Sequence, residues 1–93
     1  MKYEIQRTSQ FKKDFKLALK RNCDVNKFRK AVELLANGET LPEIYLDHPL
    51  KGNYSGYREC HIEPDWLLVY KITESVLILT LYRTGTHSDL FSK

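Results

Sequence analysis

The spacing of the apolar residues changes midway along this chain, from a helical repeat to the alternation typical of strands. In the first half, Phe11, Phe15 and Leu19 recur every four residues, and a second apolar stripe follows a polar break at 22–24. Such stripes place the apolar side chains on one face of a helix. From residue 57 onward the chain carries three short runs rich in β-branched and aromatic residues. The change in period predicts a small domain in which helices precede a sheet.

Polar residues mark the limits of two helices. Thr8 or Ser9 offers a cap for the first helix, which we expect to run to about Arg21. Residues 22–24 break this helix and supply the cap of a second one, which ends at Asn37 before Gly38. The apolar face of the second helix consists of Val25, Phe28, Ala31, Val32 and Leu35. The two segments therefore predict a helical hairpin.

Four segments have the residue composition or alternation of strands, namely residues 2–6, 57–63, 66–72 and 76–83. The connections at 64–65 and 73–75 are short enough to join the last three strands as antiparallel hairpins. The last strand carries apolar residues on both of its faces, which is typical of a central strand that is covered on both sides. Residues 39–55 show no period, and we expect a long connection there. The predicted fold is α+β: an N-terminal strand, a two-helix hairpin and a three-strand antiparallel meander, in one sheet with the helices on one face.

The length of 93 residues predicts a single domain over residues 1–93. No signal peptide is recognisable, and the longest apolar run, at 76–81, is too short to cross a bilayer, so we expect a cytoplasmic protein without a membrane partner. Cys23 and Cys60 lack metal-ligand spacing and predict reduced thiols.

The net charge of +3 permits an anionic partner without demanding one. Basic residues nevertheless crowd the first half of the chain, where the predicted first helix contributes Lys12, Lys13, Lys16 and Lys20. These lysines form either a solvated helix face or a face directed toward RNA. Both interpretations stay open at this point.

The three histidines of the chain all fall in its second half. His48 lies in the aperiodic connection, His61 in the second predicted strand, and His87 after the last one. Strand alternation puts His61 on the face opposite Cys60 and Ile62, so it points away from the helices if those two residues meet them. Imidazoles beside a carboxylate and an arginine are suited to proton transfer on a phosphate ester.

In this order of elements, the sequence resembles the RelE superfamily of toxins from bacterial toxin–antitoxin pairs, and within it the YafQ branch. The segments that carry the resemblance are 47–50 (DHPL), 56–58 (GYR), 61–66 (HIEPDW) with Tyr70-Lys71, and 83–87 (RTGTH) with Leu90-Phe91. The similarity covers nearly the whole chain.

The resemblance implies a RelE-like fold and an mRNA interferase that cleaves message in the A site of the 70S ribosome until a cognate antitoxin neutralises it. It also implies catalytic importance for the positions of His48, His61, Asp65 and His87, with Phe91 at the edge of the site. Much of the superfamily uses lysine, arginine and tyrosine around the phosphate instead, and this chain departs from that pattern.

RNA cleavage without a metal or other cofactor needs a base for the 2′-hydroxyl, an acid for the leaving 5′-oxygen and a cation for the phosphate. We assign the acid to His87 and the base to Asp65 or His61. Arg83 is the predicted phosphate ligand, and His48 could orient or stabilise. Trp66 is expected in the core by default, although Trp66 or Phe91 could stack on a base.

Two other classes of function remain open. Three histidines and Asp65 could ligate zinc in a metal-dependent hydrolase, but no His-x-x-x-His or Cys-x-x-Cys spacing supports such a site. A non-catalytic subunit that binds a partner or nucleic acid is the other alternative, and it predicts that the histidines are dispensable.

Overall fold

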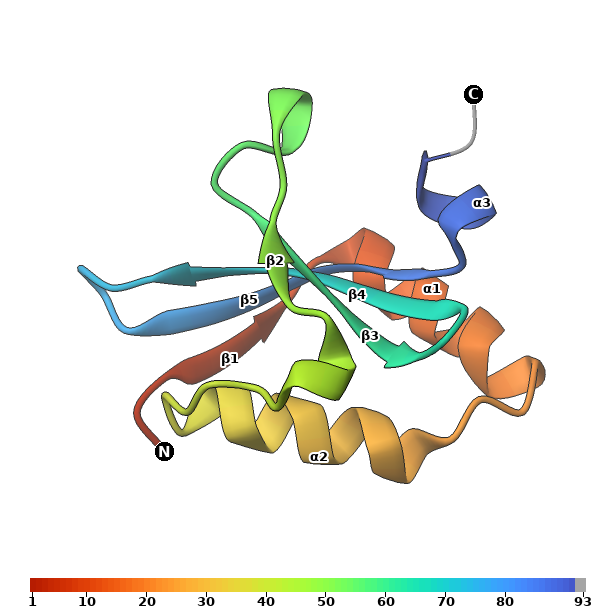
Figure 1. Ribbon diagram of the computed structural model, residues 1–93, viewed down its shortest axis with the longest axis horizontal. Coiled ribbons are helices and arrows are strands. Elements are labelled where there is room, and N and C mark those ends of the chain that lie inside the picture. Colours follow the sequence, from red (N-terminus) through yellow and green to blue (C-terminus); the bar gives the residue numbers. More distant parts are fainter. Residues whose placement is uncertain (92–93) are drawn as a thin grey trace.

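The computed structural model describes residues 1–91 and places two long helices against one face of a five-stranded sheet (Figure 1). The strands are β1 (Glu4–Arg7), β2 (His48–Pro49), β3 (Arg58–Glu63), β4 (Trp66–Thr73) and β5 (Ile78–Gly85). The helices are α1 (Ser9–Lys20), α2 (Val25–Ala36) and α3 (His87–Phe91), with short 3₁₀ turns η1 (Glu43–Tyr45) and η2 (Gly52–Tyr54). The predicted α+β class is confirmed.

The caps of the helices are those expected from the sequence. Thr8 Oγ1 accepts a hydrogen bond from Phe11 N at 2.9 Å and begins α1. Asp24 begins α2 by accepting from Asn26 N at 3.0 Å. None of the described helices is long and apolar enough to cross a membrane.

The sheet has the strand order β1-β5-β4-β3-β2, and only the β1–β5 pair is parallel. The predicted antiparallel meander is therefore present, with β5 in a central position between β1 and β4. This strand runs two residues later than expected, because a turn at 74–77 places Leu77 at a φ of 54°.

The expectation of an aperiodic connection at 39–55 is wrong in part. His48 lies on β2, which pairs antiparallel with β3 so that His48 is opposite Glu59. A strand of two residues is too short to produce a recognisable alternation. The short helix α3 at the C-terminal end was likewise not predicted from the sequence.

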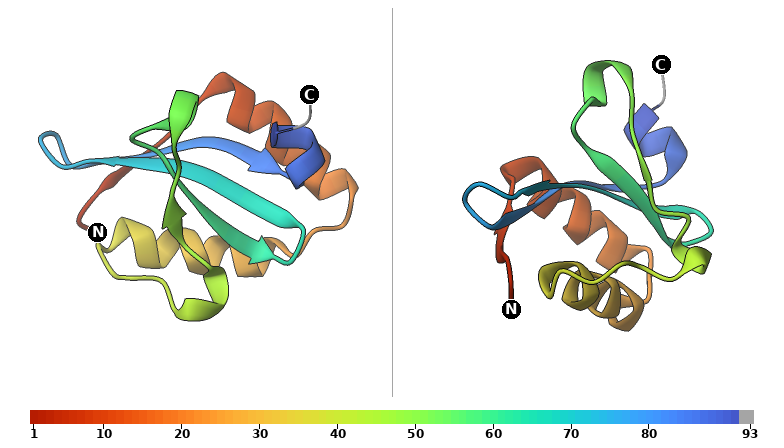
Figure 2. Two further views of the ribbon diagram at one scale, coloured as in Figure 1. Left: turned by 45° about the horizontal axis from the view of Figure 1, so that its top comes forward. Right: turned by 60° about the vertical axis from the view of Figure 1, so that its left-hand side comes forward.

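The two faces of the sheet carry different clusters. Cys60 and Ile62 pack with Phe11 and Leu35 in the larger core beneath the long helices, as strand parity predicts. Leu67 and Val69 point to the other face, where Leu90 of α3 packs on them. Figure 2 shows that α3 and the segment 50–57 rise side by side from this second face, opposite α1 and α2. They enclose the surface on which the histidines lie.

Candidate active site

A buried carboxylate lies at the centre of the histidines. Glu59 is 4% exposed, and its Oε1 is 3.8 Å from Nε2 of His61 and 3.5 Å from Nε2 of His48. Residues 59 and 61 share a face because they are two apart on β3, and His48 is brought in by the β2–β3 register. Three side chains from two neighbouring strands thus meet on the face away from the long helices.

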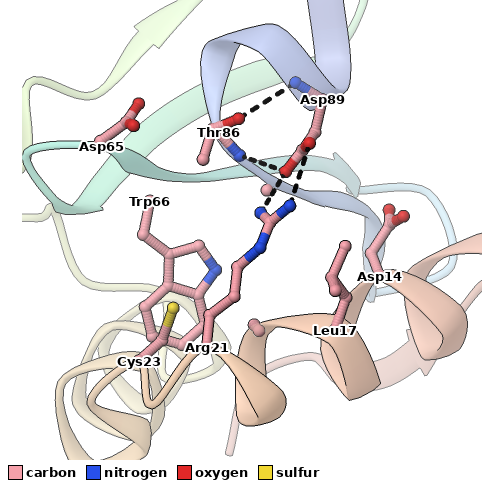
Figure 3. A pocket seen from close by; sticks show the side chains of 10 residues that line it. Asp14, Leu17, Arg21, Cys23, Asp65, Trp66, Thr86 and Asp89 are labelled. Carbon is pink, nitrogen blue, oxygen red and sulfur yellow. Dashed lines mark hydrogen bonds and ion pairs between the residues drawn. The ribbon is translucent and has the colours of Figure 1, made fainter.

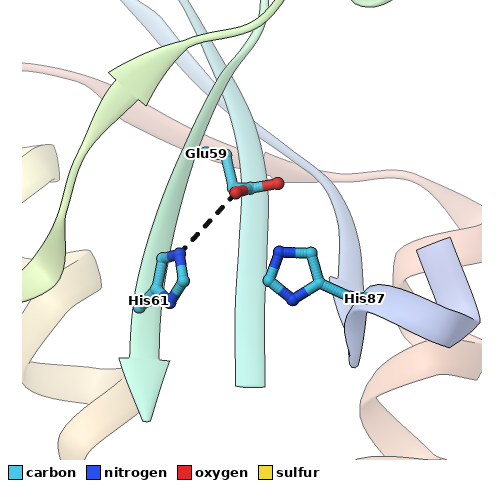
Figure 4. Close-up of side chains that lie close together, drawn as sticks. All are labelled: Glu59, His61 and His87. Atoms are coloured by element: carbon cyan, nitrogen blue, oxygen red, sulfur yellow. Dashed lines mark ion pairs between the residues drawn. The ribbon is translucent and has the colours of Figure 1, made fainter. Parts of the chain in front are cut away.

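His87 completes this cluster from the other side. Its ring centroid is 5.7 Å from that of His61, and Figure 4 shows the two rings across β4 from each other, with the Glu59 carboxylate close to both. One ligand atom each from Glu59, His61 and His87 lies within 4.8 Å of the others. The three predicted histidines are therefore brought together, and Glu59 is the group that sequence reasoning missed.

The position of His48 is held by its neighbours. Its Nδ1 donates to the carbonyl of Leu46 at 2.8 Å, since a carbonyl can only accept, and this turns Nε2 toward Glu59. The preceding Asp47 accepts from Tyr70 Oη at 2.5 Å and from Arg58 Nη2 at 3.2 Å. Burial, followed by the bond to Asp47, raises the pKa of Tyr70, so its hydroxyl stays a donor. These bonds tie β2 to β3 and β4.

An aromatic wall adjoins the cluster and consists of Tyr54, Tyr57, Tyr82 and Phe91. Tyr57 and Tyr82 have ring centroids 4.5 Å apart, and Tyr54 contacts Phe91 edge-on at 5.5 Å. Phe91 is in turn 6.3 Å from His87. Phe91 lies at the edge of the site, as expected, whereas Tyr54 and Tyr82 were not anticipated. Such rings are suited to stacking on unpaired bases.

Arg83 forms a forked ion pair with Asp14 of α1. Its Nε is 2.8 Å from Asp14 Oδ2 and its Nη2 is 3.2 Å from Oδ1. Hydrogen bonds to Asp14 raise the pKa of Arg83, to which the nearby Tyr54 and Tyr82 contribute. Burial alone would raise the pKa of Asp14, but its bonds to Arg83, Gln10 and Thr84 lower it. Arg83, the predicted phosphate ligand, thus already binds the Asp14 carboxylate of α1 through Nε and Nη2. Its remaining guanidinium nitrogen, Nη1, lies outside this forked pair.

Trp66 lies in the core, as expected by default, and is not exposed for the alternative role of stacking on a base. Trp66 is 3% exposed and stacks on Phe28 of α2 with centroids 5.7 Å apart. It shares the helix-facing side of β4 with Leu68, because the two residues are two apart. Its Nε1 is buried and finds no partner among residues 1–91.

Asp65 is exposed in the turn between β3 and β4 and lines a cavity of about 30 Å³ with Arg21, Trp66 and Thr86. In Figure 3 the hydrogen bonds beside this cavity join Arg21, Thr86 and Asp89, and none of the drawn bonds reaches Asp65. The structure therefore places Glu59, and not Asp65, within the histidine cluster.

A larger cavity of about 540 Å³ opens beside His61. Ile62 and Tyr45 are among the residues that line it, and Lys27 and Lys30 of α2 contribute cationic side chains. The predicted lysines of α1 (Lys12, Lys13, Lys16 and Lys20) are all exposed and do not line this cavity.

Comparison with known proteins gives a consistent family. Residues 3–92 match the model of the family described as the bacterial toxin of type II toxin–antitoxin systems, YafQ. The mRNA interferase toxin YafQ of Escherichia coli (strain K12) is 48% identical over 89 residues, which is 95% of this chain and 95% of that protein.

Solved structures agree. The crystal structure of YafQ from E. coli strain BL21(DE3) has a TM-score of 0.89 at 47% identity and covers 96% of this chain and 98% of that one. YafQ in the E. coli DinJ–YafQ complex gives 0.87 at 48% identity, with the same coverage. A metal-bound toxin from Helicobacter pylori gives 0.90 at 43% identity and covers 96% of this chain and 99% of that one.

Proposed function

Since the chain belongs to the YafQ family of toxins from bacterial type II toxin–antitoxin systems, we propose that it is an mRNA interferase, an endoribonuclease that cleaves message. The observation that carries this proposal is the buried Glu59 carboxylate within 3.8 Å of both His48 and His61, with His87 adjoining. Groups that exchange protons need such an arrangement.

In the proposed reaction the 2′-hydroxyl loses its proton as its oxygen attacks the neighbouring phosphorus, and the 5′-oxygen gains a proton as it leaves. His87 is the acid, because it begins a helix at the rim where a leaving group can reach it. His61 is the base and Glu59 its partner, since the carboxylate orients the ring and stabilises the imidazolium that forms. Chain cleavage then yields a 2′,3′-cyclic phosphate and a 5′-hydroxyl. No metal ion takes part in these steps.

The remaining groups bind substrate. Arg83 offers Nη1 to the scissile phosphate while Asp14 fixes the plane of the guanidinium. Phe91 and the tyrosines of the aromatic wall stack on bases on either side of the cut. His48 stabilises charge from the opposite edge of the cluster.

We infer that cleavage depends on the ribosome, because the net charge of the chain is modest. A net charge of +3 is too small to grip free RNA through many phosphates. We infer that the ribosome presents the message in its A site and that Lys12, Lys13, Lys16 and Lys20 face ribosomal RNA. The alternative role of these lysines, a solvated helix face, predicts no effect of their removal on cleavage.

The partner that restrains the toxin is a cognate antitoxin, as the E. coli DinJ–YafQ complex exemplifies for a relative. The cavity beside His61 has exposed apolar rims, with Ile44 82% and Leu46 60% exposed, and two lysines. These features suit an acidic segment with apolar anchors that orders on binding.

Induced expression without antitoxin tests the proposal. We expect growth arrest with new mRNA ends inside coding regions for the wild type, and neither for His87→Ala produced at the same level. A non-catalytic binding subunit predicts equal toxicity for both. Arrest with intact message would exclude the nuclease.

A further inference from the structure

The indole N–H of Trp66 is a buried donor that no protein acceptor satisfies. Trp66 is 3% exposed, and its Nε1 has no hydrogen-bond partner within residues 1–91. An indole nitrogen can only donate, and leaving a buried donor unpaired costs more than an ordinary hydrogen bond contributes. Buried N–H groups of folded proteins are therefore nearly always paired with protein or with ordered water. The nitrogen of Trp66 calls for an acceptor that is not part of the chain.

A small cavity adjoins this side chain at the junction of α1, β4 and α3. Trp66 lines it together with Leu17 and Arg21 of α1 and with Thr86 and Asp89 at the start of α3. Figure 3 shows the indole nitrogen on the edge of the ring that faces Arg21 and Leu17. The cavity volume is about 30 Å³, and a water molecule needs about 10–15 Å³ of such space. The cavity therefore has room for a water molecule and not for a larger ligand.

The charges around the cavity select a neutral occupant. A cation would face the guanidinium of Arg21 and the N–H of Trp66, and an anion would face the carboxylates of Asp14, Asp65 and Asp89. A neutral molecule that both accepts and donates hydrogen bonds suits the donors and the carboxylates alike. Water is such a molecule, and buried waters typically bind two to four polar groups that lack other partners.

We propose that one ordered water molecule occupies this cavity, accepts the hydrogen bond of Trp66 Nε1 and donates to the Asp89 carboxylate. Asp89 Oδ2 already accepts from Arg21 Nη1 at 2.6 Å and from Thr86 N at 3.0 Å. Its Oδ1 lies 3.5 Å from Arg21 Nη2 and keeps a lone pair for a further donor. The water thus links the first residue of β4 to α3 and holds the start of that helix from a second side. This link goes beyond the proposed function, because it holds α3 whichever reaction the histidines perform.

Occupancy is tested first, in a crystal and in solution. A high-resolution crystal structure should show a water about 2.7–3.2 Å from Nε1 and within hydrogen-bond distance of Asp89. In solution the indole hydrogen should show a nuclear Overhauser contact to a long-lived water, and the signal needs no assignment because Trp66 is the only tryptophan. A direct hydrogen bond from Nε1 to a protein acceptor such as Asp65, or failure of either measurement to detect the water, would overturn the proposal.

The link to α3 is tested by removing the donor without changing the size of the ring. In 3-benzothienylalanine a sulfur atom replaces the indole N–H, and growth of a tryptophan auxotroph on this analogue alters only Trp66. The reporter is the amide of Leu90, which donates to the carbonyl of Thr86 at 3.1 Å within α3. We expect its hydrogen exchange to become roughly threefold to tenfold faster, the change that corresponds to the loss of one net hydrogen bond.

A second analogue is the matched control. 5-Fluorotryptophan, incorporated in the same way, keeps the N–H and should leave the exchange rate of the Leu90 amide as in the wild type. The amide of Gly38, which donates to the carbonyl of Leu35 at the end of α2, should exchange at the wild-type rate with both analogues. Equally fast exchange of Leu90 with both analogues would assign the effect to ring packing, and an unchanged rate with 3-benzothienylalanine would show that the water does not hold α3. Either result would overturn the link.

Discussion

Arg21, the C-terminal cap of α1, holds Asp89 of α3 by an ion pair of 2.6 Å between Nη1 and Oδ2. The same carboxylate oxygen accepts from Thr86 N at 3.0 Å, and Asp89 N donates to Thr86 Oγ1 at 3.1 Å (Figure 3). This reciprocal pair caps the helix that His87 begins. The position of a proposed catalytic group therefore depends on a contact with a helix on the other side of the sheet.

Arg21→Gln should lower the single-turnover rate of message cleavage by about tenfold to a hundredfold, because displacement of a reacting group by about 1 Å can cost that much. Binding to the ribosome should change little. Arg29→Gln, an exposed arginine of α2, is the matched control. An unchanged rate for Arg21→Gln would show that the other contacts of α3, among them the packing of Leu90, are enough to position it.

The same contact predicts an acid-sensitive helix. Hydrogen bonds from Arg21 and Thr86 lower the pKa of Asp89 from 3.8 to about 2. A carboxyl whose folded pKa is depressed stabilises the fold above its unfolded pKa and loses that contribution as the pH falls through its folded value. Amide exchange or NMR signals of α3 should thus report loosening between about pH 4 and 2. Asp89→Asn should remove the pH dependence in this window, and a wild-type profile in that variant would assign it to another carboxyl.

Gly85 permits the close approach of Asp89. A Cβ at residue 85 would lie 2.9 Å from Asp89 Oδ2 and 3.0 Å from Asp89 Cβ. Gly85→Ala should therefore displace Asp89 and lower cleavage. Gly52→Ala is the informative comparison, since a Cβ at Gly52 meets nothing within 4 Å, although its φ of +65° also makes alanine strained. Equal cleavage rates for the two variants would argue that the contact with Asp89 is unimportant.

Most of the fold follows from local sequence patterns. Thr8 and Asp24 cap the helices where the periodicity begins, and the alternation of β3 correctly placed Cys60 and His61 on opposite faces of the sheet. The family indicated by the motifs is confirmed by the comparisons.

The structural features that could not be predicted from the sequence depend on contacts between residues distant in the chain. Glu59 shares the parity of His61, yet its burial beside His48 requires the register of a two-residue strand. The Arg83–Asp14 pair joins residues 69 apart, and no local pattern encodes it. Trp66 was expected in the core by default, but its partner there, Phe28, is 38 positions earlier in the sequence and no local pattern identifies it.

The two cysteines should differ in reactivity. Burial raises the pKa of both thiols, and Cys60 is fully buried whereas Cys23 is only partly so. Because the thiolate is the reactive form, N-ethylmaleimide should modify Cys23 first and Cys60 only on unfolding. Mass spectrometry of the native and the urea-treated protein measures this, with Cys23→Ser as control. Modification of Cys60 at the same rate in both conditions would mean that the sheet opens readily.

The carboxylate that supports the base can be identified by comparing two substitutions. Sequence alone favoured Asp65 or His61 as the base, whereas the structure places Glu59 beside His61. Glu59→Gln keeps the size of the side chain but removes its charge, so it should slow single-turnover cleavage by orders of magnitude with little change in ribosome affinity, because the imidazolium develops mainly in the transition state. Asp65→Asn should have a much smaller effect.

His87→Ala should lose as much activity as Glu59→Gln, and the double variant should lose little more if the two residues act as a unit. The products of the wild type should carry a 2′,3′-cyclic phosphate and a 5′-hydroxyl. A 5′-phosphate would indicate attack by water in place of the 2′-oxygen, and a greater loss for Asp65→Asn than for Glu59→Gln would return the role of the base to Asp65.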